Sequence, residues 1–143
     1  MHQKLFVVAA ATLLVAAAIP VVAHHSFAAE FDVNKPVTIK GRVFKVEWTN
    51  PHSWIYIDAA GADGKVERWA VEGGAPNALL RRGWTKNSVP VGVDIIVEGF
   101  QAKDGSFRAN GREIVFPDGK KLFIGSEGTG APDEKAGRGR GGR

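Results

Sequence analysis

Three histidines have the side-chain type and the positions that a metal site needs. His24 and His25 are adjacent, and His52 follows Asn50 and Pro51 further along the chain. If processing makes His24 the first residue, it offers an α-amine as well as an imidazole, and these two groups together chelate one ion. Nitrogen-rich ligand sets of this kind suit Cu(II) or Zn(II). The sequence therefore predicts a copper or zinc site formed by His24, His25 and His52.

The competing interpretation is that these histidines do not bind one metal ion together. The predicted site is analogous to the histidine brace of secreted copper proteins, but its spacing is looser than a defined metal motif. Two histidines at a chain terminus bind metals weakly, and a histidine after proline is often a hydrogen-bonded corner residue. Cleavage after Ala28 would also remove both His24 and His25.

Aromatic residues suggest a second kind of site. Trp54 and Tyr56 share one face of a predicted strand, and Trp69 lies on the next strand. Aromatic rings stack on sugars and other planar groups, so these residues predict a surface for a glycan, a peptide or a partner protein. The alternative is that one or more of the rings is core packing. No nucleic-acid partner is expected, since the formal net charge is only +4 and the chain is predicted to leave the cytoplasm.

Acid–base catalysis is the third possibility. Glu47, Asp58 and Glu72 could act with His52, but nothing in their spacing brings them together. The chain shows no Ser-His-Asp or paired-carboxylate signature. The prediction is a binding or accessory protein without catalytic residues, and not an enzyme.

The N-terminus predicts export. Lys4 precedes an apolar run from Leu5 to Ala18, and Pro20 comes shortly before the small residue Ala23. These features are typical of a signal peptide over residues 1–23, with cleavage after Ala23 and a periplasmic or secreted product. A retained membrane anchor is the alternative, although the run is short for a membrane span. No transmembrane span is expected in the mature chain.

The mature chain is predicted to be one small domain that relies on its hydrophobic core. The full sequence has 143 residues and no cysteine, which excludes disulfides and thiolate ligands. Alternating apolar residues predict five or six strands and a short helix. The strands are expected at 37–48, 53–59, 66–72, 93–100, 107–116 and 122–124, and the helix at 76–82.

The first of these strands is the clearest indication of the fold. Its apolar residues change parity between Val43 and Phe44, so the strand must be bent, and Gly41 is the expected position of the bend. A long bent strand serves the two halves of a small closed barrel. The element order predicts an OB-fold-like, mainly β antiparallel barrel with one short helix between strands three and four. A β-sandwich is the alternative.

The ends of the mature chain are predicted to lie outside the barrel domain, which is expected at residues 35–124. Residues 24–34 form an N-terminal arm in which Phe27 and Phe31 pack either as one helical turn or in an extended form. Residues 125–143 are rich in Gly and Arg and predict a disordered tail. Its last residues, Arg138–Arg143, either contact anionic polymers or lipid, or are simply solvated.

Several segments resemble a family of small exported bacterial proteins defined only as a domain of unknown function. They are HHSFAAEFD at 24–32, KPVTIKG at 35–41, VEWTNPHSWIYID at 46–58, PNALLRRGW at 76–84, VEGFQAKDGS at 97–106 and DGKKLF at 118–123. The family's Pro-Gly-Asp turn before strand four is lengthened here to Pro90–Asp94. The resemblance implies no activity and no catalytic residues.

Overall fold

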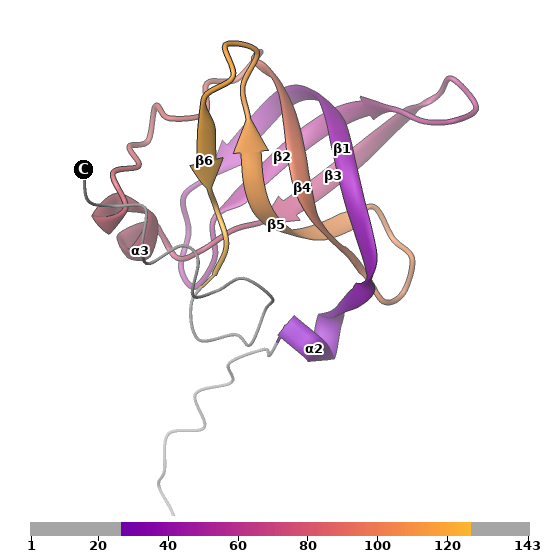
Figure 1. The fold of residues 1–143 in the computed structure, drawn as a ribbon, viewed down its shortest axis with the longest axis horizontal. Helices are drawn as coiled ribbons and strands as arrows, with labels where there is room; N and C mark the ends of the chain where they lie inside the picture. The colour runs from indigo at the N-terminus through magenta and orange to yellow at the C-terminus, as the bar shows by residue number, and fades with distance from the viewer. Residues whose placement is uncertain (1–26, 127–143) are drawn as a thin grey trace, which may run out of the picture.

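A computed structural model describes residues 27–126, which form a mainly β domain (Figure 1). Its six strands are β1 (Phe31–Glu47), β2 (Trp54–Ala60), β3 (Val66–Glu72), β4 (Asp94–Ala102), β5 (Arg108–Val115) and β6 (Lys121–Phe123), and its two helices are α2 (Phe27–Glu30) and α3 (Pro76–Arg81). The position of α3 between β3 and β4 confirms the predicted element order. The predicted signal peptide, His24, His25 and most of the predicted tail lie outside the described residues.

The strands pair in a closed ring. Their order in the sheet is β3-β2-β1-β4-β5-β6, and β3 also pairs with β5. The other pairs are antiparallel, but β3 and β5 run parallel over Ala70–Glu72 and Arg108–Asn110. The predicted antiparallel arrangement is therefore confirmed for the other pairs, and β3 with β5 is the exception. Buried side chains from β1 to β5 form the main core.

Strand β1 connects the two halves of the ring, as its predicted bend requires. Residues 36–42 pair with β4 and residues 41–47 pair with β2. The irregularity lies between Val43 and Lys45, so the extra residue is Phe44. The expected bend at Gly41 lies three residues before the bulge at Phe44, which is where the inward-facing side of the strand changes.

The bulge also explains the parity change along β1. Ile39 and Val43 are buried before it, and Val46 and Trp48 pack against the core after it. Phe44 itself is 37% exposed and does not join the core.

Three hairpin turns share the same Asp-Gly chemistry. In each turn the aspartate Oδ1 accepts a hydrogen bond from the backbone N–H two residues further on, and the glycine has a positive φ. The pairs are Asp63-Gly64, Asp104-Gly105 and Asp118-Gly119. Each of these pairs lies between two consecutive strands, β2 and β3, β4 and β5, or β5 and β6.

The segment before β1 packs onto the sheet as a helical turn. Phe27 of α2 is 5% exposed, and its ring centroid lies 5.9 Å from that of Phe31 and 5.5 Å from that of Phe100. The backbone N–H of Lys103 donates to the Glu30 carbonyl at 2.9 Å.

Strand β1 begins at Phe31, six residues before the predicted start at 37. At the other end Gly125 and Ser126 are still buried, so packed structure extends beyond both expected domain limits.

Candidate functional site

The corner between β1 and β2 carries His52. The Asn50-Pro51 peptide bond in this corner is cis. The Ser53 N–H donates to the Gly74 carbonyl at 3.1 Å, and the Gly73 N–H donates to the Ser53 carbonyl at 2.8 Å. These two bonds fix the corner against the end of β3, so the backbone at His52 has a defined position.

The imidazole of His52 is held through one of its two nitrogens. Nδ1 lies 3.3 Å from the Gly73 carbonyl oxygen and 3.4 Å from Glu72 Oε1. Both neighbours are acceptors, which favours the tautomer with the proton on Nδ1 and the lone pair of the neutral ring on Nε2. The His52 side chain is 21% exposed and that of Glu72 is 9% exposed. Metal-binding histidines are held in this way, with the second nitrogen bonded to a carboxylate or a carbonyl.

Glu72 belongs to a row of side chains that crosses four strands. Trp54 on β2 pairs with Glu72 on β3, Glu72 pairs with Asn110 on β5, and Asn110 pairs with Phe100 on β4. Residues paired across neighbouring strands present their side chains to the same face. Glu72 is 7% exposed and Asn110 is 1% exposed, so this row contains two buried polar groups.

The carboxamide of Asn110 is the less usual of the two. Its Oδ1 is buried and has no hydrogen-bond partner among the described residues. Leaving a buried acceptor unsatisfied costs about 1–3 kcal/mol, and such groups are few in native proteins. Sequence reasoning did not identify Asn110, because only the register of β3 with β5 places it beside Glu72.

The row ends beside the first described residues of the chain. Phe27 contacts Phe100 edge to face, and His24 precedes Phe27 by three residues. Within the described residues, Phe100 and Glu72 are separated by two strand spacings of about 4.8 Å each, with Asn110 between them.

The described residues do not form a metal site by themselves. Within residues 27–126, no group of three His, Cys, Asp or Glu side chains could hold an ion. The structure brings His52 next to Glu72, whereas His24 and His25 lie outside the described part. A complete site at this corner would require ligands from beyond residues 27–126.

The predicted aromatic surface is divided between two faces of the sheet. Trp54 and Tyr56 are half-buried on the outer face of β2. Trp69 is 8% exposed, pairs with Ile57 and belongs to the core. The three rings therefore do not form one surface, and the core interpretation applies to Trp69.

The outer rings near β2 are each stacked with a cation that is paired with a carboxylate. The three sets are Trp54 with Arg108 and Glu30, Tyr56 with Lys45 and Glu47, and Phe44 with Arg68 and Asp58. In these sets the cation lies 5.8, 5.1 and 5.1 Å from the ring centroid. One side of each ring is thus already occupied, which makes this face a poorer platform for stacking a ligand.

The carboxylates considered for catalysis are not brought together. Glu47 accepts a hydrogen bond from the Tyr56 hydroxyl at 2.8 Å, and Asp58 accepts one from Arg68 Nε at 3.1 Å. Glu72 alone contacts His52 among the three. The geometry gives no support to the acid–base arrangement considered from the sequence.

The Glu47 set predicts a small acid sensitivity. Hydrogen bonds from Lys45 and then Tyr56 lower the pKa of Glu47 below its ordinary value of 4.5. A depressed carboxylate pKa stabilises the fold above the unfolded-state pKa, and this contribution is lost as the pH falls through the folded-state pKa. We expect Glu47→Gln to flatten the fall in unfolding free energy below about pH 4.5, measured by urea denaturation from about pH 6 to about pH 3. Equal pH slopes in the two proteins would contradict this expectation.

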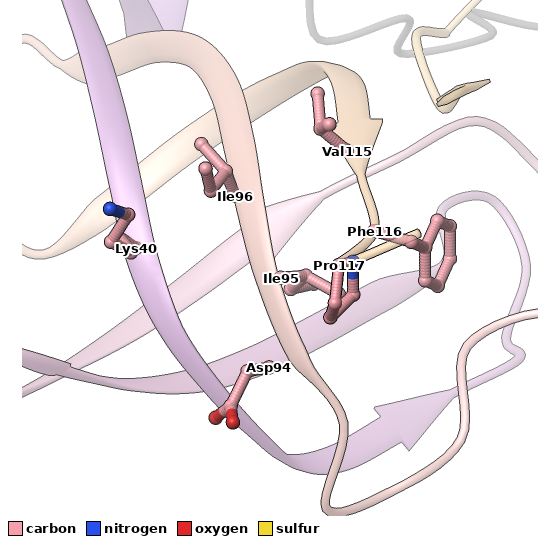
Figure 2. A pocket seen from close by; sticks show the side chains of 7 residues that line it. All are labelled: Lys40, Asp94, Ile95, Ile96, Val115, Phe116 and Pro117. Carbon is pink, nitrogen blue, oxygen red and sulfur yellow. The ribbon is translucent and has the colours of Figure 1, made fainter. Parts of the chain in front are cut away.

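A shallow pocket lies elsewhere, on the outside of β1, β4 and the end of β5 (Figure 2). Its volume is about 220 Å³. Figure 2 shows Lys40 and Asp94 on the β1 side of it and Phe116 and Pro117 on the other. The Asp94 carboxylate is already bound by the Arg42 guanidinium through two hydrogen bonds of 2.9 Å. None of the residues predicted to bind a ligand lines this pocket.

These features define a small mainly β protein whose most distinctive polar group is a corner histidine with Nδ1 3.3 Å from a backbone carbonyl and 3.4 Å from a buried carboxylate. The chain belongs to the family of unknown function DUF6152, whose model matches residues 10–111. No curated protein and no solved structure matches the chain significantly. Among residues 27–126, neither helix has the length and the apolar character needed to cross a membrane.

Proposed function

We propose that this protein is an exported metal-binding accessory module in which His52 and the N-terminal histidines hold Cu(II) or Zn(II). The observation that carries the proposal is the hydrogen bonding of His52. Nδ1 faces the Gly73 carbonyl and the Glu72 carboxylate, which leaves Nε2 as the coordinating atom. A ring fixed in this orientation loses little freedom when it binds an ion.

The remaining ligands would come from the mature N-terminus. His24 supplies its α-amine and imidazole, and His25 supplies a second imidazole. Near neutral pH both kinds of group can be deprotonated, which coordination requires. The packing of Phe27 against Phe100 supports the proposal because it fixes, beside β4, the residue that lies three positions after His24.

Export and processing after Ala23 are part of the same proposal. Cleavage after Ala28 would remove Phe27, whose buried ring packs on Phe31 and Phe100. This cost favours a cleavage site upstream of Phe27. Mass spectrometry of the mature protein recovered from the periplasm tests it directly, since a chain that starts at Ala29 would contradict both the cleavage site and the metal site.

We further propose that the closed ring of strands is an OB-like barrel. Its support is the order of three strands, a helix and further strands, together with the pairing of β3 with β5 that closes the ring. In OB-folds the face of strands two and three is the usual binding surface. Trp54 on β2 and Glu72 on β3, which pair with each other, belong to these two strands.

Metal titration of the mature protein tests the proposed function. We expect Cu(II) or Zn(II) to bind more tightly than micromolar, and His52→Ala to weaken the affinity at least tenfold because it removes one of the ligands. Isothermal titration calorimetry measures both affinities. A Lys65→Ala protein, altered in the β2–β3 hairpin, serves as the control and should bind as the wild type does.

Two results would contradict the proposed site. One is binding that is micromolar or weaker, and the other is binding that does not change in His52→Ala. A chain that keeps one extra residue before His24 gives a further check, because blocking the α-amine should also weaken binding.

A further inference from the structure

We infer that the β2–β3 hairpin is a dimerisation surface, where the outer edge of β3 pairs antiparallel with the same edge of a second copy, about a two-fold axis at Val66. This inference is independent of the proposed metal site. Its basis is a stretch of β3 whose backbone has a partner on one side only. Strand β3 pairs with β2 along its full length, but it pairs with β5 only from Ala70 to Glu72.

The free edge consists of the outward backbone groups of Val66 and Arg68. The N–H of Ala70 donates to the Phe107 carbonyl on the side away from β2, so the even-numbered residues of β3 turn their backbone groups to that side. Within residues 27–126, the groups of Val66 and Arg68 that face the same way have no hydrogen-bond partner. An edge of this kind is a template for another strand.

The edge is open to a second molecule. Figure 1 shows the loop between β2 and β3 extending past the rest of the sheet. Val66 is 66% exposed, and the side chains of Lys65 and Arg68 are 84% and 72% exposed. Charged side chains on an edge normally prevent pairing, so the positions of the charges decide which pairings are possible here.

The charges allow one register for a symmetric pair. An axis at Lys65, Glu67 or Arg68 would place that residue directly opposite its own copy, and like charges directly opposite one another destabilise a strand pair. An axis at Val66 avoids this conflict. It places Val66 opposite Val66 and Lys65 opposite Glu67 of the second copy, once on each side of the axis. A two-fold pair of this kind is self-complementary.

The favoured register joins an acid to a base at two places. Lys65 and Glu67 of the second copy would form a non-hydrogen-bonded pair, in which the Cα atoms lie about 4.5 Å apart and the side chains are close. The Glu67 carboxylate is already oriented, because its Oε2 accepts the Trp69 indole N–H at 3.0 Å. Lys65 Nζ lies 3.3 Å from Asp63 in its own turn, but such an exposed pair is weak, so the ammonium is free to turn to Glu67.

The pair is expected to be weak. The contact is confined to one hairpin edge of each copy, which is less than the about 1,200–2,000 Å² that stable interfaces bury. The two Val66 residues would exchange both of their backbone hydrogen bonds, with Cα atoms about 5.5 Å apart. The experiments must therefore detect a dimer that dissociates readily.

Disulfide trapping captures such a dimer. The chain has no cysteine, so Val66→Cys carries the only thiol, and a Cα separation of about 5.5 Å is within the range that disulfides span. We expect Val66→Cys to form a disulfide-linked dimer about tenfold faster than Val91→Cys under the same mild oxidant, because pairing raises the effective concentration of the thiols. Val91 is the matched control, since it is the same residue type, is 65% exposed and lies in the loop before β4.

Lys65→Cys tests the register. In the proposed pair Lys65 faces Glu67 and not its own copy, so Lys65→Cys should cross-link as slowly as Val91→Cys. Equal rates for Val66→Cys and Val91→Cys would overturn the dimer. Faster cross-linking of Lys65→Cys than of Val66→Cys would overturn the register.

Sedimentation velocity of the purified protein tests the dimer without a covalent bond. A chelator is included, so that the result does not depend on metal. The wild-type sedimentation coefficient should rise with concentration, and Val66→Lys should weaken association about tenfold because it places two ammonium groups at the axis. Val91→Lys should associate as the wild type does. A wild-type protein that stays monomeric at millimolar concentration would overturn the inference and leave the edge of β3 to a strand of a different protein.

Discussion

Replacing Gly41 by alanine is expected to destabilise the domain strongly. A Cβ at this position would lie 2.2 Å from the Asp58 carbonyl oxygen. That oxygen belongs to the backbone of β2, and Gly41 pairs with Ala59 on one side and Ile95 on the other, so neither strand can move away. Overpacking commonly costs about 1–3 kcal/mol, and a clash with backbone on a doubly paired strand puts this substitution at or above the upper limit.

Urea denaturation followed by circular dichroism measures this effect through the midpoint and the free energy of unfolding. Gly61→Ala is the control, because its Cβ would meet the flexible Glu67 side chain and not backbone, at 2.8 Å from Oε1 and 3.0 Å from Cγ. That side chain can rotate, so the control should remain close to the wild type. A Gly41→Ala protein as stable as Gly61→Ala would show that β1 and β2 separate more easily than their pairing indicates.

Replacing Phe27 by alanine is expected to have the second large effect, on both stability and metal affinity. Truncating a buried phenylalanine costs about 3–5 kcal/mol, and the position of Phe27 at the margin of the domain favours the lower value. The ring also fixes the start of α2 against Phe100. The histidines that we propose as ligands directly precede this ring in the chain, so the proposed function predicts that Zn(II) affinity falls in parallel.

Val33→Ala is the matched control for this substitution. Val33 lies in the same segment but is 49% exposed, so its truncation should change the unfolding free energy by less than about 0.5 kcal/mol. Thermal denaturation and Zn(II) titration of both variants give the comparison. If Phe27→Ala lost stability but bound Zn(II) normally, the N-terminal segment would not be part of the site.

The local pattern of the sequence was sufficient to predict the interior strands. In β2, Ile55, Ile57 and Ala59 alternate with outward residues and are all buried. Strand β3 was predicted with the observed bounds, Val66–Glu72. Period-two alternation is a local property, and Asp-Gly turns mark the ends of the hairpins, so neither feature depends on distant partners.

The pairing of strands was beyond the reach of sequence alone. Trp69 and Val71 alternate on the same side of β3, which was a usable sign that Trp69 faces the core. Which residues of β2 lie on that side depends on the register, and the register pairs Trp69 with Ile57. The row that joins Glu72 and Asn110 depends on the parallel pairing of β3 with β5. No local pattern indicates that contact.

The early start of β1 was missed for a different reason. Asp32, Asn34 and Pro36 are poor strand formers, yet they belong to β1. Their extended conformation comes from the packing of Phe31 and from the pairing of Phe31 and Pro36 with β4. Tertiary contacts override local propensity here.

The closed ring has a consequence for the order in which the chain can fold. The hairpin of β2 and β3 is local, but β1 waits for β4: Thr38 and Glu98, hydrogen-bonded across this pair, are 60 positions apart. Contacts so distant in sequence slow folding, because the intervening loop must close first. While the chain is being synthesised, one edge of β1 therefore stays unpaired until β4 has emerged. An unpaired edge is a template for strands from other molecules, so that interval is when a holding chaperone would protect this protein most.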